Sequence, residues 1–543
     1  MMFLASAVSL AAQQASSPDT RGAYFAIKKY EPQASLPTFA TLKDRLPSPV
    51  FDENPEFVHV YWKTWEIACR NFKEPRSGSG LVSQYVDAAF NGNIFLWDTC
   101  FMTMFYNVAH PLTPGIGSLD NFYARQHDDG EICREIIARD GKDEWVAEDT
   151  KNLIARWGFD PHHKHLRIIP YIGRAAPQPA AEVSLDGLDN PLPAWAEMES
   201  FHVTGDRARL ALVYPPLVKY YEAFRRFVRQ GNGLYLTCWS SMDNSPRNEF
   251  LKGGGCGVET SAQMVLFARE LAEMARLLGL PPDEARFNGD AAATAAIINK
   301  LMWDPEKKFY YDVDGSNHRI PVMTVAGFWP MLAGVANKDQ AAALVAELNN
   351  PATFKRVNRI PTLAADQKGY EHGGNYWRGS VWAPTNTMVI RGLEKYGYNE
   401  LARDIALGQL TNVCAVFDKT HTIWENYAPD SVAPGSDSRK DFVGWSGIYP
   451  ILYFLEFRIG LKPDAPTNTL TWTLNTTRRA GCERYRFNGH VADLIATPDA
   501  GGWNVSVTSD GNFALVMKLP EGAQTAHDIH AGPQSFHLPA SRS

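Results

Sequence analysis

Residues 372–386 read HGGNYWRGSVWAPTN, the densest run of Gly, Trp, Tyr, Arg and Asn in the chain. Its three glycines let the backbone turn and approach a ligand closely. Its aromatic rings offer flat apolar faces, and its arginine and asparagines offer polar donors. Residues 381–393 continue as an apolar, helix-compatible segment, so a Gly-rich loop that only leads into a core helix is the alternative interpretation. The composition favours a pocket wall at the start of a helix.

Apolar residues recur at helical spacing on both sides of this stretch. Phe57, Tyr61 and Trp65 share one face near residue 54, and a second amphipathic segment ends at Gly279. About twelve such segments, including 322–336 and 445–457, lie between residues 54 and 461. Such helices with almost no long strands predict an all-α architecture, and six consecutive hairpins around one axis, an (α/α)6 toroid, fit best. The helical periodicity is interrupted at about 141–192, where we expect an inserted loop region.

The chain changes character at both ends of this helical domain. Residues 22–53 are rich in Pro, Ser and Ala and predict an extended N-terminal arm. Residues 462–543 alternate polar with apolar or β-branched residues between Asn-Gly, Gly-Gly and Asp-Gly turns, which predicts a small β-sandwich-like C-terminal domain. From about residue 524 onward we expect disordered or loosely packed chain.

Residues 1–21 resemble a signal peptide, with a short apolar stretch before small and polar residues. They lack a positive n-region and a clean A-x-A site, so we expect a periplasmic or secreted protein with the cytoplasm as the alternative. No later segment reaches the roughly 18 uninterrupted apolar residues of a membrane span. The net charge of -7 without a basic patch argues against nucleic-acid binding. The oligomeric state stays open, with a monomer as one alternative.

Two loops bring carboxylates into aromatic surroundings. Asp243 lies in CWSSMDNSPRNE and Glu425 lies in TIWENYAPDS, both turn-prone segments. A carboxylate among aromatic residues is how a protein raises a carboxyl pKa or positions a carboxylate beside a sugar. Glycosidic bond cleavage needs two such groups. The alternative for each residue alone is a surface or capping role, because Asp favours turns for local reasons.

Nothing in the sequence supports a metal or a cofactor. The histidines of PHHKH (161–165) do not have zinc-site spacing. DVDGSN (312–317) resembles the start of a calcium loop, but Met323 stands where the loop needs Glu, so a hairpin turn is the better interpretation. Seven dispersed cysteines argue against a disulfide framework. His127, Asp128 and Asp129 form a polar cluster that contacts sugar hydroxyls or caps helices.

The motifs LWDTCFM, SMDNSPR, GGNYWRGSVWAPTN, ENYAP and DFVGWSG occur in this order between residues 96 and 447. As a set they resemble the six-hairpin (α/α)6 glycoside hydrolases related to trehalase, processing α-glucosidase and mannosylglycerate hydrolase. The resemblance implies an inverting hydrolase in which Asp243 is the general acid and Glu425 the general base. It further implies substrate contacts from seven residues: Trp97, Asp98, Arg247, Tyr376, Trp377, Arg378 and Trp445.

The signature sequences of trehalase around the Trp-Asp motif and the general acid are absent from this chain. Their absence favours the bacterial α-glucosidase and mannosylglycerate-hydrolase-like branch. We therefore expect an enzyme that cleaves α-linked glucosides or mannosides of oligosaccharides or small glycosides. The sequence leaves the sugar, the linkage and the substrate length open. Two alternatives remain: a polysaccharide lyase, and a non-catalytic glycan-binding protein on the same toroid.

Overall fold

The computed structural model describes residues 22–32, 35–142, 190–237, 242–251, 255–519 and 523–539. The predicted signal peptide, the PHHKH stretch and most of the predicted insertion lie outside these ranges. No helix within them combines the length and the apolar character that a membrane crossing requires.

Helices are the main secondary structure of the described residues between 54 and 460. The α-helices are α3 (Tyr24–Ile27), α4 (Phe39–Leu42), α5 (Pro55–Ala68), α6 (Leu96–Tyr106), α7 (Asp120–Ala124), α9 (Pro193–Thr204), α10 (Arg207–Phe227), α11 (Asn248–Leu251), α12 (Val258–Leu278), α13 (Pro281–Leu301), α14 (Trp329–Leu332), α15 (Lys338–Leu348), α16 (Ala383–Lys395) and α17 (Asn399–Thr420). The 3-10 helices are η1 (Cys69–Asn71), η2 (Asn107–Ala109), η3 (Gly115–Leu119), η4 (Val325–Phe328), η5 (Trp445–Ile448) and η7 (Ala465–Thr467), and η6 (Tyr449–Ile459) is a π-helix.

Local sequence signals fix several helix ends. The Asn54 side chain accepts the N–H of Glu56 at 3.1 Å, and Pro55 occupies the first position of α5, where its missing N–H costs nothing. Gly279 ends α12 in the left-handed conformation, with φ 74°. Both predicted ends are confirmed. The helix predicted over 322–336 is wrong in extent, because only η4 and the short α14 form there.

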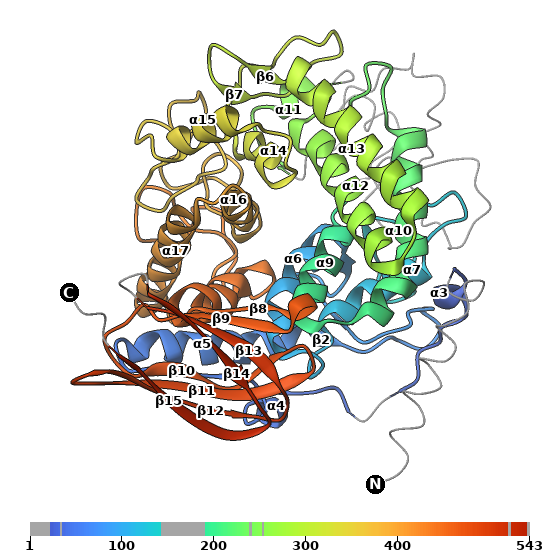
Figure 1. Ribbon diagram of the computed structural model, residues 1–543. Helices are drawn as coiled ribbons and strands as arrows, with labels where there is room; N and C mark the ends of the chain where they lie inside the picture. The colour runs from blue at the N-terminus through green and yellow to red at the C-terminus, as the bar shows by residue number, and fades with distance from the viewer. Residues whose placement is uncertain are drawn as a thin grey trace.

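Six helical segments form a closed cycle, in which each segment packs on the one that follows it. Helix α6 contacts α9, α9 contacts α12, α12 contacts α14, α14 contacts α16, α16 contacts η5, and η5 returns to α6 (Figure 1). The other long helices pack on members of this cycle or on η6: α10 and α13 on α12, and α5 and α17 on η6. Six helical segments are therefore linked in a closed cycle of contacts, and the loops before α6, α16 and η5 meet at one cavity.

The C-terminal part forms two sheets, which confirms the predicted β-rich region. The strands are β1 (Ser48–Phe51), β2 (Phe72–Lys73), β3 (Tyr85–Val86), β4 (Ile94–Phe95), β5 (Glu135–Ile136), β6 (Trp303–Asp304), β7 (Phe309–Tyr310), β8 (Leu461–Asp464), β9 (Thr469–Thr473), β10 (Ala480–Phe487), β11 (His490–Asp499), β12 (Gly502–Ser509), β13 (Phe513–Lys518), β14 (Gln524–Ile529) and β15 (Gly532–Pro539). One sheet has the order β1-β10-β11-β12-β15 and the other β14-β13-β9-β8. All their pairings are antiparallel except that of β9 with β13.

Two expectations about the chain ends are wrong. The N-terminal arm is not extended throughout, because α3 and α4 form within it. Its end forms β1, which pairs with β10 in the C-terminal sheet. The stretch after residue 523 is not disordered: β14 pairs with β13, and β15 pairs with β12 over eight residues. Ile529 and Leu538 are buried, while most side chains between them alternate between exposed and half-buried. Because few side chains of β14 and β15 are buried, the sequence of this tail has no clear alternation of apolar and polar residues.

Helices and sheets share one continuous hydrophobic core. The Phe454 ring of η6 packs edge-on against Phe51 of β1 and Phe57 of α5, each with ring centroids 5.9 Å apart. The Trp472 indole in β9 donates a hydrogen bond of 3.0 Å to the carbonyl oxygen of Ile459. The sheets therefore cover one end of the helix cycle and leave the other end to the loops that carry the candidate site.

Candidate active site

A cavity of about 370 Å³ lies at the N-terminal ends of α6, α16 and η5. Seven of the nine predicted site residues line it: Trp97, Asp98, Asp243, Tyr376, Trp377, Glu425 and Trp445. These residues come from segments that are far apart in the sequence, and the cycle of helices brings them to one place. The volume of the cavity falls within the usual range for small-molecule sites.

The aromatic wall of the cavity is held rigidly. The Trp377 and Trp382 rings stack with centroids 4.4 Å apart and an interplanar angle of 3°. Trp382 also packs against Trp445 at 5.5 Å and donates its indole N–H to the carbonyl oxygen of Tyr376 at 3.1 Å. Tyr376 adopts the left-handed backbone conformation, with φ 55°, which a non-glycine residue seldom does outside functional turns. The wall is therefore shaped before any ligand arrives.

Glu425 is a buried carboxylate of the site, with 2% of the residue exposed. Its backbone is fixed by two contacts: its carbonyl oxygen accepts the Trp445 indole N–H at 3.2 Å and the Ser446 hydroxyl at 3.1 Å. Burial raises the pKa of Glu425 to about 7, and the positive charge of Arg439 offsets only part of this effect. The Asp243 and Asp437 charges add to the rise. Glu425 thus changes charge near neutral pH.

Asp243 is exposed and lies on a short turn. The next residue, Asn244, ties this turn to the aromatic wall. Its side chain accepts the backbone N–H of Trp377 at 2.8 Å and donates to the carbonyl oxygen of Asn375 at 3.1 Å. The Arg378 guanidinium donates to the Asn244 carbonyl oxygen at 3.2 Å. Arg378 therefore does not line the cavity, against the sequence-based expectation, but holds the Asp243 turn against it.

Arg247 is also absent from the cavity lining, which contradicts the predicted substrate contact. Its side chain is fully buried and pairs with Glu259 at the start of α12 and with Asp312, whose Oδ2 lies 2.9 Å from the guanidinium Nε. Asp312 in turn accepts the N–H of Val258 at 2.8 Å. The arginine of SMDNSPR thus anchors the Asp243 loop to the helix cycle from behind.

Asp98 contributes a third carboxyl group to the cavity. It lies in the first turn of α6 and is 6% exposed. Burial raises the pKa of Asp98 to about 8, with a further rise from Glu425 and an opposing effect from Arg134. Because burial raises the pKa of both Asp98 and Glu425, the cavity holds fewer negative charges at neutral pH than the number of its carboxyl groups.

Residues that the sequence analysis did not single out complete the cavity. They are Phe90, Asn91, Asn93, Phe95, Arg134, Glu135 and Arg439. The amides of Asn93 and Asn91 donate to Glu135 Oε1 at 2.7 and 3.3 Å. Two sequence features could have identified these residues: the Asn-Gly-Asn turn before α6 and the polar segment near residue 130. The His127 cluster of that segment does not line the cavity, although Arg134 and Glu135 do.

Among the described residues, no group of three or more His, Cys, Asp or Glu side chains is arranged to hold a metal ion. The side chains that line the cavity offer carboxyl groups, amides, guanidinium groups and aromatic faces. Such a set suits a polar ligand with one apolar face, such as a sugar ring.

Comparison with known proteins assigns the class: this chain is a glycoside hydrolase of the six-hairpin clan. Residues 158–446, more than half of the chain, match the model of the mannosylglycerate hydrolase MGH1-like glycoside hydrolase domain, and the chain belongs to that family. The matched range includes Asp243 and Glu425.

Individual proteins are similar to this chain in sequence or in fold. A protein of Borreliella burgdorferi is 27% identical over 361 residues, 64% of this chain and 75% of that protein. The mannosylglycerate hydrolase of Rubrobacter radiotolerans is 33% identical over 137 residues, 25% of this chain and 30% of that protein. The structure of a GH63 mannosylglycerate hydrolase from Thermus thermophilus in complex with glucose is similar in fold, with a TM-score of 0.54 at 20% identity. The similarity covers 72% of this chain and 98% of that chain.

Proposed function

We propose that this glycosidase hydrolyses small α-linked mannosides or glucosides with inversion, with Asp243 as general acid and Glu425 as general base. The observation that carries the proposal is that both carboxyl groups line one cavity together with Trp377 and Trp445, which pack on Trp382. One carboxyl group protonates the leaving oxygen while the other takes a proton from water on the opposite face of the sugar.

The assignment of the two roles rests on the resemblance of the SMDNSPR and ENYAP motifs to the known family. Glu425 is buried and its pKa is raised to about 7, so it is a strong enough base near neutral pH and needs only small environmental changes to ionise. Asp243 lies on the exposed turn at the cavity rim, where a leaving group departs toward solvent. Asp98, Asn93 and Glu135 supply further hydroxyl-binding groups in the cavity.

The mannosylglycerate hydrolases are named for a substrate with an acidic glycerate group, and the cavity of this chain offers a guanidinium for such a group. Arg439 lines the cavity, and its side chain is 54% exposed over the Phe90 ring, with Cζ 4.7 Å from the ring centroid. A carboxylate on the leaving group would meet this guanidinium, which is suited to carboxylate recognition. We therefore place mannosylglycerate among the first substrates to test.

The architecture that goes with this function is the (α/α)6 toroid, which the closed contact cycle of six helical segments supports. We propose residues 54–461 as the catalytic domain, with about 141–192 as an insertion, and residues 462–543 as a β domain. The arm at 22–53 contributes β1 to that domain.

The test is monosaccharide release from a panel that includes mannosylglycerate, trehalose and methyl or aryl α-mannosides and α-glucosides. Release by the wild type and not by Asp243→Asn establishes hydrolysis at this cavity and names the sugar. Equal release from mannosylglycerate by the wild type and by both Asp243→Asn and Glu425→Gln would contradict the assignment of this cavity.

A further inference from the structure

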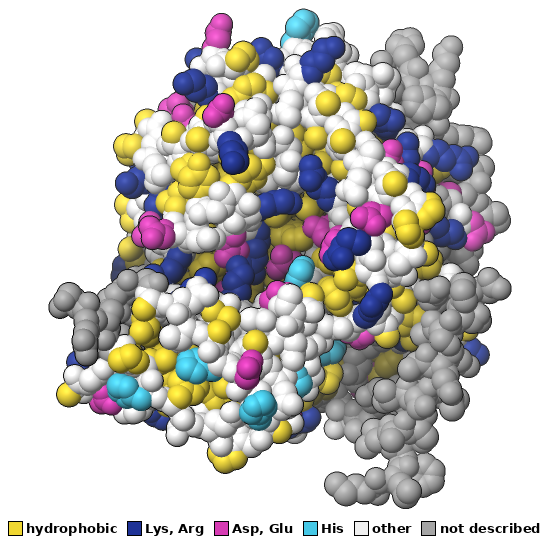
Figure 2. Space-filling view, viewed as in Figure 1, with side chains coloured by type: hydrophobic (Ala, Val, Ile, Leu, Met, Phe, Trp, Pro, Cys, Tyr) yellow, Lys and Arg dark blue, Asp and Glu magenta, His cyan; other side chains and the backbone are white. Residues whose placement is uncertain are grey.

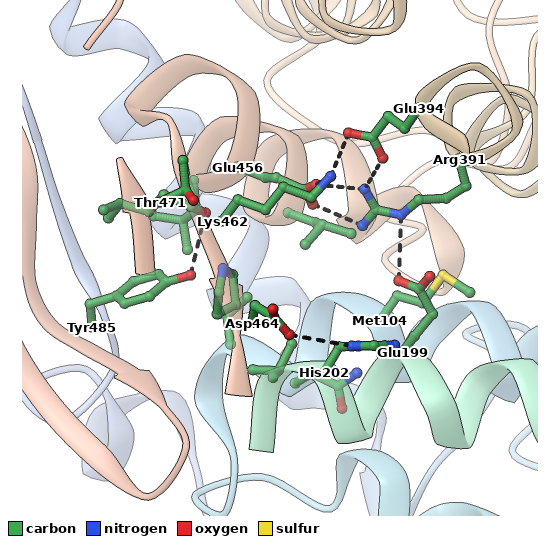
Figure 3. A pocket seen from close by; sticks show the side chains of 17 residues that line it. Met104, Glu199, His202, Arg391, Glu394, Glu456, Lys462, Asp464, Thr471 and Tyr485 are labelled. Carbon is green, nitrogen blue, oxygen red and sulfur yellow. Dashed lines mark hydrogen bonds and ion pairs between the residues drawn. The ribbon is translucent and has the colours of Figure 1, made fainter. Parts of the chain in front are cut away.

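A second and larger cavity, of about 520 Å³, lies at the opposite end of the same helices. It is lined by the C-terminal parts of α6, α9, α16 and η6 and by β8 of the C-terminal sheet (Figure 3). Helix α6 carries Asp98 in its first turn and Met104 in its last, so these lining residues of the two cavities lie about 9 Å apart along the helix axis. Nothing in the proposed reaction uses this second cavity.

Acidic side chains outnumber basic ones in this cavity. Arg391 contacts Glu456 at 2.5 and 2.8 Å, Glu394 at 2.9 Å and Glu199 at 3.4 Å. Lys462 of β8 lies 2.6 Å from Glu394 and 3.3 Å from Glu456. Three carboxylates thus share two cations. The Glu199 carboxylate has the longest of these ion pairs, and its other oxygen accepts the Trp195 indole N–H at 3.2 Å.

A fourth carboxylate, Asp464, lies at the mouth and faces His202 at 3.8 Å. With His202 neutral, the four carboxylates and the two cations leave an excess of two negative charges. The helix C-termini that surround the cavity add partial negative charge. Figure 2 shows acidic and basic side chains gathered with a histidine in the hollow between the helices and the sheets. The field inside the cavity therefore favours positively charged ligands.

An independent feature also points to a donor-bearing ligand. Asn107, at the end of α6, lines the cavity and is 2% exposed. Its Oδ1 is buried and accepts no hydrogen bond from any described residue. A buried amide oxygen without a donor carries an unmet desolvation cost, which a ligand N–H would relieve. Apolar side chains that include Met104, Leu452 and Leu455 line the rest of the cavity and suit a methylene chain.

We propose that this cavity binds a small organic dication of the aliphatic diamine or polyamine class. One ammonium group would lie toward Glu199 and the acceptor of Asn107, the methylene chain along the apolar wall, and the second ammonium toward Asp464. A metal ion fits less well, because Arg391 and Lys462 already occupy the carboxylates and no described group of three acidic, His or Cys side chains has metal-site geometry. An anion would meet the net negative field.

Isothermal titration calorimetry with putrescine and spermidine tests this site on the full-length protein. Butane-1,4-diol and succinate, which have the same chain length as putrescine without the positive charge, serve as matched probes. We expect both amines to bind and both controls not to bind. Absence of amine binding, or binding of succinate instead, would overturn the proposal.

Variants locate the bound amine. Glu199→Gln removes the carboxylate that has the longest ion pair with Arg391 and is expected to weaken amine binding at least about 10-fold, because a hydrogen bond to a charged group is lost. Glu273→Gln removes an exposed carboxylate of α12 that pairs with Arg276 and is expected to bind like the wild type. Glu425→Gln separates this cavity from the catalytic one. Weakening by Glu425→Gln, or equal affinity in Glu199→Gln and the wild type, would place the amine elsewhere and overturn the proposal.

Discussion

Arg439 touches the Glu425 carboxylate twice, through its backbone N–H at 3.3 Å to Oε2 and through its guanidinium at 3.4 Å to Oε1. Both contacts are long, and the Arg439 side chain is 54% exposed, so solvent screens its charge. This is why the arginine offsets only part of the desolvation of Glu425 and why the pKa of that carboxyl is about 7. The pH dependence of catalysis should therefore respond to this pair.

Arg439→Gln removes the charge that favours ionised Glu425, so the pKa of Glu425 should rise further. A general base acts only when it is deprotonated, and kcat/KM should therefore fall as pH drops through about 7 in the wild type. In the variant we expect this acidic limb to move to higher pH, by up to about one unit. Arg439→Lys is the control that keeps the charge. An acidic limb that stays in place, or moves to lower pH, would contradict the role of the pair.

Leaving-group dependence separates the acid from the base. Asp243→Asn and Glu425→Gln should each lose about 100-fold to 10,000-fold in kcat on a glycoside with an alcohol leaving group. On the corresponding α-glycosyl fluoride, whose leaving group needs little protonation, Asp243→Asn should recover much of its rate and Glu425→Gln should not. Glu371→Gln, an exposed carboxylate outside the cavity, is the control. If only Glu425→Gln recovered its rate on the fluoride, Glu425 would be the general acid and Asp243 the general base.

The raised pKa of Glu425 also predicts how the stability of the folded protein depends on pH. Its pKa rises from an ordinary value of 4.5 to about 7 on folding, so the folded protein loses stability as pH rises between these two values. Glu425→Gln, which stays neutral, should therefore be more stable than the wild type at pH 8, by roughly 1–3 kcal/mol, with little difference near pH 4. Urea unfolding at both pH values measures this. A variant that is less stable at pH 8 would show that the charged form is favoured in the fold.

Arg247 should affect stability more than substrate affinity. Arg247→Met leaves Glu259 and Asp312 buried without their cation, which typically costs about 3–5 kcal/mol. Arg276→Met breaks an exposed pair with Glu273 and should change the unfolding free energy by less than about 1 kcal/mol. If Arg247→Met were as stable as the wild type and only its KM were raised, the result would show that Arg247 contacts the substrate and does not stabilise the fold.

The fold was largely predictable because its helices carry strong periodic patterns and clear ends, as at Asn54 and Gly279. The partners of β1 were not predictable, because a four-residue strand from the arm pairs with a strand more than four hundred residues away. The strands after residue 523 were missed for a different reason: few of their side chains are buried, so backbone pairing rather than an apolar pattern holds them.

The site was predictable where a motif places its side chains directly on the cavity. Trp97, Asp98 and Trp445 were expected at the site from the resemblance of their motifs, and they line the cavity at the starts of α6 and η5. The motif could not show which way its arginine points, so Arg247 was expected in the cavity and lies behind it. Arg439 was missed because its role arises from a contact made across a fourteen-residue loop.

The anomeric form of the first product tests the opposed action of Asp243 and Glu425 most directly. Proton NMR spectra, recorded in the first minutes after the wild type is mixed with the α-glycoside that it cleaves fastest, distinguish the two anomers before they interconvert. We predict that the β-anomer appears first, because water activated by Glu425 attacks the face opposite the leaving group. Initial release of the α-anomer would show retention, and would mean that one of these carboxylates attacks the sugar itself.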